Sequence, residues 1–256
     1  MSDLYEIAGL RLAVKTTGTI GVGPTIVMLH EGLGSITQWR DFPDRIHAAT
    51  GLPVVAYDRS GYGRSELGPA KYGPDFMHHE ALEILPALLQ SFEISEPILL
   101  GHSDGASIAL IAAASELLNP IGVVTIAAHI FVEPAGLHGV QGAKERRDLI
   151  VKGMARHHHE PAIAFDRWST IWLDPRFESF DIREMLGAIT CPLLVLQGDH
   201  DEYATEEMVD GIIQRVPQAT GRFISHCGHI AHKDQPDVLI EEIVAFLSTL
   251  GNNSVS

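Results

Sequence analysis

A serine within the sequence Gly-His-Ser-Asp-Gly, residues 101–105, is the strongest candidate for a chemical group in this chain of 256 residues. An apolar run over 97–100 precedes it, and a helix-like run of small and apolar residues over 106–114 follows it. A strand, Gly-x-Ser-x-Gly and a helix in this order predict a serine at the tip of a sharp turn, with its hydroxyl exposed. The glycines allow the backbone to bend tightly without a side-chain collision. We therefore expect Ser103 to be a nucleophile in acyl chemistry.

A serine hydroxyl needs a base to remove its proton, and the base needs a third group to orient it. A histidine follows a short strand-like run in the sequence Cys-Gly-His at 227–229, and an acidic cluster at 199–202 follows an apolar run. The chain order Ser103, Asp201, His229 is the order expected for a Gly-x-Ser-x-Gly triad. These three residues are the predicted catalytic set.

Neighbouring residues compete for two of these roles. Asp199 and Glu202 are alternatives for the acid, and His226 and His232 are alternatives for the base in a chain with 14 histidines. Carboxylates that do not orient the base are expected to lie in a solvated turn that opens a helix, where the helix dipole favours negative charge.

The composition is that of a soluble globular protein, with 45% hydrophobic and 20% charged residues. No apolar stretch reaches the roughly 18 residues that a membrane-spanning helix needs. The formal net charge of −15 argues against nucleic acid and anionic membrane surfaces as partners. A small-molecule substrate is therefore expected, and the sequence leaves the oligomeric state open.

The ends and the cysteines of the chain bear on its location. The first residues are acidic and lack the pattern of a secretory signal. Cys191 and Cys227 cannot form a disulfide framework, and neither belongs to a zinc-spaced motif. We expect a reducing cytoplasm as the location, no metal and no cofactor.

Apolar runs and turn residues predict strands that alternate with helices. A hairpin is expected over 4–17, and further strands over 25–30, 53–58, 97–100, 121–127, 192–196 and 221–225. Helices are expected over 38–49, 76–92 with a kink at Pro86, 103–118, 205–215 and 235–250. This alternation implies a mostly parallel sheet covered on both faces, with ligands at the carboxyl ends of the strands.

The alternation stops over 133–188, which carries helical patterns without a buried strand and is interpreted as a lid. The core is then expected over 1–132 and 189–250, with a disordered tail over 251–256.

Two groups of residues within this lid could contact other parts of the protein. Phe165, Trp168 and Trp172 have helical spacing and predict a seam with the core, an apolar wall for the substrate, or both. The basic and histidine-rich stretches 146–147 and 156–160 are expected to be solvated surface, because consecutive histidines on a helix point in different directions and do not converge on a metal.

Together these motifs identify a family. The loop His-Glu-Gly-Leu-Gly-Ser at 30–35, the turn Asp-Arg-Ser-Gly-Tyr-Gly-Arg-Ser at 58–65, the serine motif, Gly-x-x-Asp at 198–201 and Gly-His at 228–229 resemble the α/β-hydrolase fold superfamily over nearly the whole chain. The resemblance implies a mostly parallel eight-stranded sheet with helices on both faces, a helical lid insertion and a Ser-His-Asp triad.

The resemblance also implies an oxyanion hole of two backbone N–H groups. One belongs to Asp104 and the other to Gly32, with Leu33 as the competitor, because Glu31 occupies a place more often held by glycine. His30 and His102 are expected to be structural.

The groups expected to contact the substrate lie in the loops and in the lid. They are Leu33, His129, Trp168, Trp172 and Ile230.

These observations predict a serine hydrolase that cleaves a small carboxylic ester, lactone or thioester through an acyl-enzyme. A hydrolase of C–C bonds in ring-cleavage diketone acids is an alternative, because it uses the same triad. A small-ligand receptor without catalysis is a further alternative, since a fold alone does not fix a function.

Overall fold

The computed structural model describes residues 2–68 and 72–250, so the tail predicted to be disordered lies outside the described residues. Eight strands in this part of the chain form one sheet, in the order β1-β2-β4-β3-β5-β6-β7-β8. Their bounds are Asp3–Ile7 (β1), Leu10–Thr17 (β2), Pro24–Leu29 (β3), Val54–Tyr57 (β4), Glu96–His102 (β5), Gly122–Ile126 (β6), Leu193–Gly198 (β7) and Ala219–Ile224 (β8). Strand β2 runs antiparallel to β1 and to β4, and all other neighbours are parallel. The α/β-hydrolase fold class expected from the sequence is confirmed.

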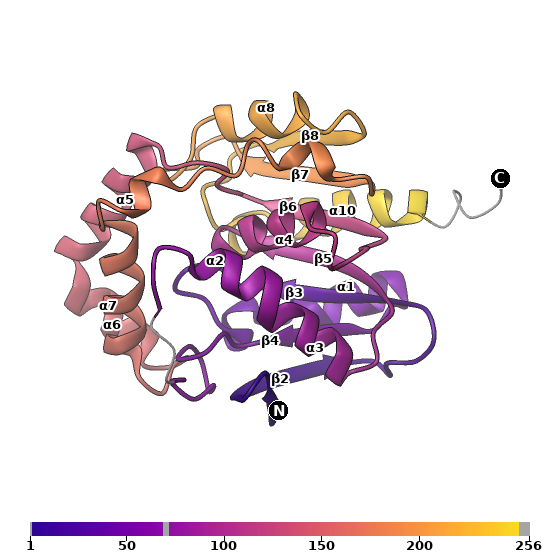
Figure 1. Ribbon diagram of the computed structural model, residues 1–256. Helices are drawn as coiled ribbons and strands as arrows, with labels where there is room; N and C mark the ends of the chain where they lie inside the picture. The colour runs from indigo at the N-terminus through magenta and orange to yellow at the C-terminus, as the bar shows by residue number, and fades with distance from the viewer. Residues whose placement is uncertain (1, 69–71, 251–256) are drawn as a thin grey trace.

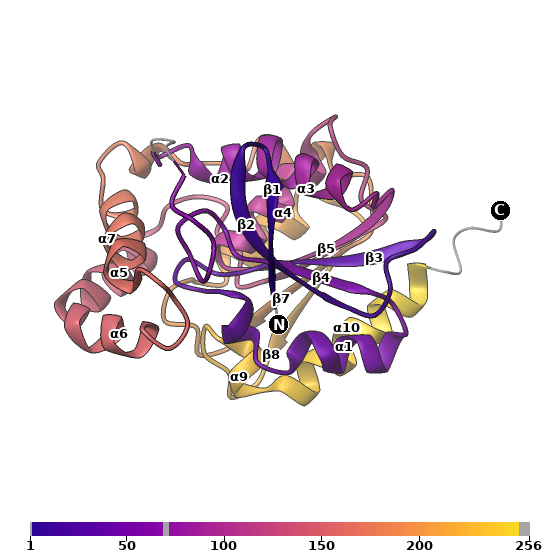
Figure 2. The same ribbon diagram turned by 90° about the horizontal axis from the view of Figure 1, so that it is seen from below.

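Helices cover both faces of the sheet, as Figure 2 shows. One face carries α1 (Phe42–Thr50) and α10 (Pro236–Leu250), and the other carries α2 (Phe76–His79), α3 (Leu85–Ser91) and α4 (Asp104–Ala114). Helix α8 (Glu207–Ile213) lies on the same side as α4, since its buried residues belong to the same apolar core. Each face has its own apolar core, because the central strands are buried on both sides.

Two helices differ from the sequence-based prediction at proline residues. The helix expected over 38–49 is a short 3-10 helix, η1 (Ile36–Trp39), followed by α1, whose first turn contains Pro43. The helix expected over 76–92 contains the π-helical stretch η2 (Glu80–Ile84) between α2 and α3. Pro86 lies in the first turn of α3, directly after this stretch. Because proline lacks a backbone N–H, it cannot continue the hydrogen-bond pattern of the π-helix. The helix expected over 103–118 is also shorter and ends at Ala114.

The segment 133–188, here called the inserted segment, lies between β6 and β7. It contains α5 (Pro134–Glu145), α6 (Arg147–Met154), α7 (Pro161–Trp172) and the short 3-10 helices η3 (Phe177–Ser179) and η4 (Leu186–Ala188). Figure 1 shows α5, α6 and α7 gathered at one end of the sheet. All its residues are described, and it contributes no strand to the sheet, only an isolated bridge between Phe131 and Asp181. None of the helices in the described part of the chain is both long and apolar enough to cross a membrane.

Candidate active site

Ser103 stands between β5 and α4 with backbone angles φ 53° and ψ −119°. A non-glycine residue in this region is strained by about 1–3 kcal/mol and is held there by its surroundings. Helix α4 packs so close to the sheet that a Cβ on Gly101 would lie 2.2 Å from the carbonyl oxygen of Gly105. A Cβ on Gly105 would lie 2.1 Å from the carbonyl oxygen of Leu29. The two glycines of the motif therefore allow the close approach that exposes the serine at the turn.

His229 and Asp201 form a buried hydrogen-bonded pair. The Nδ1–H of His229 donates to both carboxylate oxygens of Asp201, at 2.9 and 3.0 Å. Burial alone would raise the pKa of Asp201, but the hydrogen bond from His229 lowers it below its usual value. Burial alone would lower the pKa of His229, but the bond to Asp201 raises it. The Nε2 atom of His229 is thereby left as the proton acceptor of the ring.

The competing acidic residues hold the backbone around His229. Asp199 accepts the N–H of Cys227 (3.2 Å), and Glu202 accepts the N–H of His229 (3.3 Å). The expectation that such carboxylates open a helix was wrong, since α8 begins only at Glu207. They stabilise the loop that carries the histidine.

The two competing histidines lie away from Asp201. His226 is exposed in the turn after β8. His232 is buried in α9 (Ala231–Asp234), with its ring 4.6 Å from that of Trp39.

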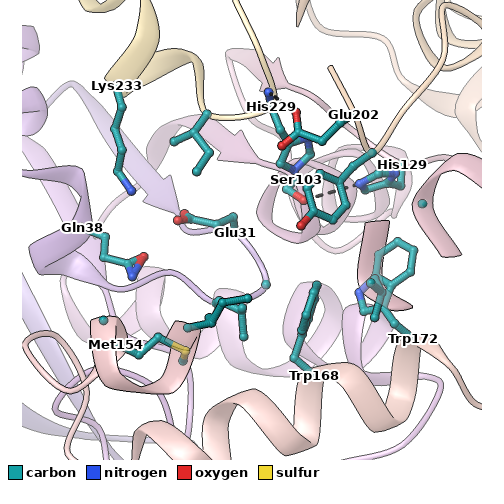
Figure 3. A pocket seen from close by; sticks show the side chains of 18 of the residues that line it. Glu31, Gln38, Ser103, His129, Met154, Trp168, Trp172, Glu202, His229 and Lys233 are labelled. Atoms are coloured by element: carbon teal, nitrogen blue, oxygen red, sulfur yellow. Dashed lines mark hydrogen bonds between the residues drawn. The ribbon is translucent and has the colours of Figure 1, made fainter. Parts of the chain in front are cut away.

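A second histidine contacts the serine. Ser103 Oγ lies 3.5 Å from His129 Nε2, and this bond is the dashed line in Figure 3. The backbone of His129 is fixed because its N–H donates to Ser107 Oγ (3.1 Å) and its carbonyl accepts from the same hydroxyl (2.6 Å). Burial and the neighbouring His229 lower the pKa of His129 to about 3. His129 is therefore neutral at ordinary pH, and in the structure it contacts Ser103, while its predicted contact with a substrate stays a prediction.

The loop after β3 is fixed by its first residue. His30 Nε2 accepts the N–H of Arg59 (3.1 Å), which places the ring proton on Nδ1, and that N–H donates to the carbonyl oxygen of Glu31 (2.7 Å). Burial lowers the pKa of His30 well below its usual value, so the ring stays neutral. The placement agrees with the structural role expected for His30.

His102 connects this loop with the loop of His229. Its Nε2–H donates to the carbonyl oxygen of His229 (2.8 Å), and its Nδ1 lies 3.4 Å from Glu31 Oε2. The side chain is fully buried. His102 therefore connects the loop after β3 with the loop of His229, which agrees with the structural role expected for it.

The three loops and the inserted segment enclose a cavity of about 360 Å³. Most of the predicted site residues line it: Gly32, Leu33, Ser103, His129, Trp168, Trp172, His229 and Ile230. Asp201 stands behind His229, and the side chain of Asp104 is buried. In Figure 3, Ser103, His129 and His229 lie together on one side, while Trp168 and Trp172 project from α7.

The sequence-based prediction missed several lining groups. They include Glu31, Gln38, Met154, Glu202, Tyr203 and Lys233. Glu31, Gln38 and Lys233 lie on the opposite side of the cavity from His129 (Figure 3). Glu31 was recognisable as an unusual residue in its loop, but nothing local to Gln38 or Lys233 indicates that they face a cavity.

The histidine-rich stretch 156–160 is only partly the solvated surface that was expected, since Arg156, His159 and Glu160 are exposed but His158 is buried. His158 is 5% exposed, accepts the N–H of Gly63 at Nδ1 (2.9 Å) and lies with Nε2 3.1 Å from the carbonyl oxygen of Leu33. His157 lies 2.9 Å from Thr37 Oγ1. The sequence alone could not predict the burial of His158, because the residues that it contacts are about a hundred positions away in the chain. In the described residues, no group of three or more His, Cys, Asp or Glu side chains is arranged to hold a metal ion.

Comparison with known proteins identifies sequence relatives. Residues 26–242 match the model of the alpha/beta hydrolase family. A 2-succinyl-6-hydroxy-2,4-cyclohexadiene-1-carboxylate synthase of Salmonella typhimurium is 25% identical over 258 residues, covering 88% of this chain and 94% of that protein.

Solved structures share the fold. A bacterial membrane phospholipase A superposes with a TM-score of 0.83 at 18% identity, over 98% of this chain and 87% of the other. The enol-lactonase from Burkholderia xenovorans LB400 superposes with a TM-score of 0.75 at 20% identity, over 96% and 100%. A meta-cleavage product hydrolase from Pseudomonas fluorescens IP01 has a TM-score of 0.75 at 16% identity, over 96% and 97%.

Proposed function

This chain belongs to the alpha/beta hydrolase family, and we propose that it is a serine hydrolase of small, uncharged carboxylic esters, lactones or thioesters. The observation that carries the proposal is the His229–Asp201 hydrogen bond at 2.9 Å, in a cavity that also exposes Ser103 on its strained turn. A nucleophile, a base and a group that orients the base are the minimum for acyl transfer by serine.

The reaction begins with a change of partner for the serine. Rotation of the Ser103 side chain between staggered positions moves Oγ from His129 toward the Nε2 atom of His229. His229 takes the hydroxyl proton as Oγ attacks the substrate carbonyl, and Asp201 stabilises the resulting imidazolium. His229 then protonates the leaving group. Water, activated by the same ring, releases the acid from the acyl-enzyme.

Two backbone N–H groups are assigned to the oxyanion. Asp104 is the first residue of α4, so its N–H has no acceptor within the helix. Gly32 lines the cavity on the loop after β3. Donors of this kind stabilise the negative oxygen of the tetrahedral intermediate, and one such donor changes the rate by roughly 100- to 1000-fold.

The charges in the cavity favour an uncharged substrate. Glu31 and Glu202 line it. Burial alone would raise the pKa of Glu31, but the neighbouring His102 lowers it well below its usual value, so this carboxylate is ionised. Among the described residues, no arginine lines the cavity, and Lys233 is its one lysine. A diketone acid would need cations to offset these carboxylates. The alternative as a C–C bond hydrolase is therefore less well supported, although one structural neighbour is named a meta-cleavage product hydrolase.

The first test compares wild type with Ser103→Ala on short p-nitrophenyl esters. The variant should lose hydrolysis and labelling by a fluorophosphonate probe, while its thermal unfolding stays cooperative. Hydrolysis retained by a folded Ser103→Ala variant would refute the serine mechanism. A wild-type protein that neither labels nor hydrolyses would favour the receptor alternative.

The second test addresses the charge of the substrate. A neutral p-nitrophenyl ester is compared with an analogue of equal length that ends in a carboxylate, and with a ring-cleavage diketone acid. We expect kcat/KM to be at least tenfold higher for the neutral ester. If the anionic compounds are turned over as fast as the neutral ester or faster, and Lys233→Ala loses that activity, the result would favour the C–C bond hydrolase instead.

A further inference from the structure

Arg59 is a buried cation for which the proposed reaction has no direct use. It follows β4, its side chain is 1% exposed, and its guanidinium lies 4.9 Å from the centre of the Tyr62 ring. The guanidinium contacts the carbonyl group that precedes Gly32 and the side chain of Asp104, which are the two residues that carry the proposed oxyanion donors. It donates to the carbonyl oxygen of Glu31 (2.8 Å) and lies 3.6 Å from Asp104 Oδ2.

The contact with Glu31 fixes the direction of one peptide group. The carbonyl oxygen of Glu31 accepts from Arg59, from His30 (2.7 Å) and from the N–H of Gly34 (3.0 Å). The described residues include no cis peptide bond, so this carbonyl and the N–H of Gly32 point in opposite directions. With the carbonyl held toward buried donors, the N–H of Gly32 is directed away from them. This geometry favours Gly32 over Leu33 as the second oxyanion donor.

The contact with Asp104 concerns charge. The backbone N–H of this residue is the other proposed donor, and its side chain is a buried carboxyl group next to that N–H. Burial raises the pKa of this carboxyl above its usual value, while Arg59 and the indole of Trp172 act in the opposite direction and favour the ionised form. An uncompensated carboxylate there would oppose the oxyanion, because charges interact strongly when water is excluded. Asp104 Oδ1 accepts the indole N–H of Trp172 from the inserted segment (3.2 Å), and Arg59 faces Oδ2.

We propose that Arg59 is a positioning residue of the oxyanion hole, which orients the Gly32 N–H through the Glu31 carbonyl and offsets the charge of the Asp104 carboxylate. The inference rests on the proposed acyl-transfer function. It also connects the inserted segment to the oxyanion hole, since Trp172 donates to Oδ1 of Asp104 while Arg59 faces Oδ2 of the same group at ion-pair distance.

The experiment compares four variants with wild type: Arg59→Met, Arg59→Lys, Asp104→Asn and the double variant Arg59→Met/Asp104→Asn. Each is measured for kcat and KM on a neutral p-nitrophenyl ester, for inhibition by a boronic acid that forms a tetrahedral adduct with the serine, and for thermal unfolding. Arg59→Met should lower kcat about 100-fold and leave KM within about threefold, since a donor in the transition state is disturbed. Its boronic acid Ki should rise in parallel, which a purely structural role would not produce.

The remaining variants separate geometry from charge. The double variant should recover about tenfold of the kcat lost in Arg59→Met, because the uncompensated carboxylate is gone. Arg59→Lys keeps the charge but lacks the planar fork that reaches two partners, so it should lose about tenfold in kcat. If Arg59→Met fails to fold, the kcat of Arg59→Lys still tests the proposal.

Three results would overturn the proposal. They are a folded Arg59→Met variant with kcat within threefold of wild type, a loss confined to KM, and a double variant no better than the single one. A wild-type protein without any esterase activity or fluorophosphonate labelling would instead refute the proposed function, and this inference with it.

Discussion

Ser103 Oγ lies 3.5 Å from Nε2 of His129, which is not the histidine that Asp201 orients. His229 and His129 both line the cavity that contains Ser103, and their surroundings shift the two pKa values in opposite directions. Two titratable groups whose pKa values are shifted apart are suited to different roles. We infer that His229 exchanges the proton, while His129 holds the hydroxyl as a neutral hydrogen-bond partner.

The pH dependence of the reaction distinguishes the two histidines. A base must be unprotonated, and the pKa of His229 is raised above its usual value of 6.5 by Asp201, against the effect of burial. We expect kcat/KM for a neutral ester to fall as the pH drops through a midpoint above 6.5. His129→Gln should leave this midpoint unchanged, since the pKa of His129 is about 3. Activity that persists down to about pH 3 would show that His129 is the base.

Replacement of the orienting carboxylate should be severe. Asp201→Asn keeps the size of the side chain but favours the wrong tautomer of His229, so kcat should fall about 10,000-fold. Asp199→Asn is the matched control, because Asp199 accepts backbone N–H groups of the neighbouring loop and lies 3.8 Å from His200 Nδ1, whereas Asp201 is bonded to His229. It should lose less than tenfold. Comparable losses in both variants, measured by stopped-flow ester hydrolysis, would reassign the acid.

Trp168 is expected to form the wall for the acyl group. Trp168→Ala should lower kcat/KM by about 10- to 100-fold for a benzoyl ester and much less for an acetyl ester, because apolar contact is lost only with the larger group. Ile163 lies on the same helix with an exposed side chain, so Ile163→Ala serves as the control. If both esters lose activity equally, Trp168 acts on the lid or on the fold and does not select the acyl group.

His158 should make folding stability depend on pH. Burial lowers its pKa to about 4 in the folded state, whereas the unfolded chain has a value near 6.5. Its contribution to stability is therefore complete above pH 6.5 and is lost as the pH falls toward 4, by about 3 kcal/mol. His158→Gln keeps a donor and an acceptor but does not titrate. Chemical denaturation at several pH values should give the variant a flatter profile than wild type between pH 6.5 and 4, and parallel profiles would contradict this prediction.

Several features could be predicted because they depend on residues close in sequence. The elbow of Ser103 was recognisable from its two glycines between a strand and a helix, and the structure gives this serine its positive φ of 53°. All strands of the sheet were expected, since continuous apolar runs form strands buried on both faces. Helix ends were less accurate, as at Pro43 and Pro86, where the local effect of proline depends on neighbouring turns.

Contacts between distant segments could not be predicted in this way. The burial of His158 depends on Gly63 and Leu33, and the role of Arg59 depends on Glu31 and Asp104, none of which adjoin these residues in the chain.

The sequence by itself determined the fold family, the sharp turn at Ser103 and the chain order of the three residues proposed as a triad, because turn chemistry and apolar periodicity act over short stretches. Only the tertiary structure decided which carboxylate faces His229, which histidine contacts Ser103 at rest, and how charge is distributed in the cavity. The physical reason is that hydrogen bonds, burial and pKa values depend on groups brought together by packing, and a linear sequence does not record those neighbours.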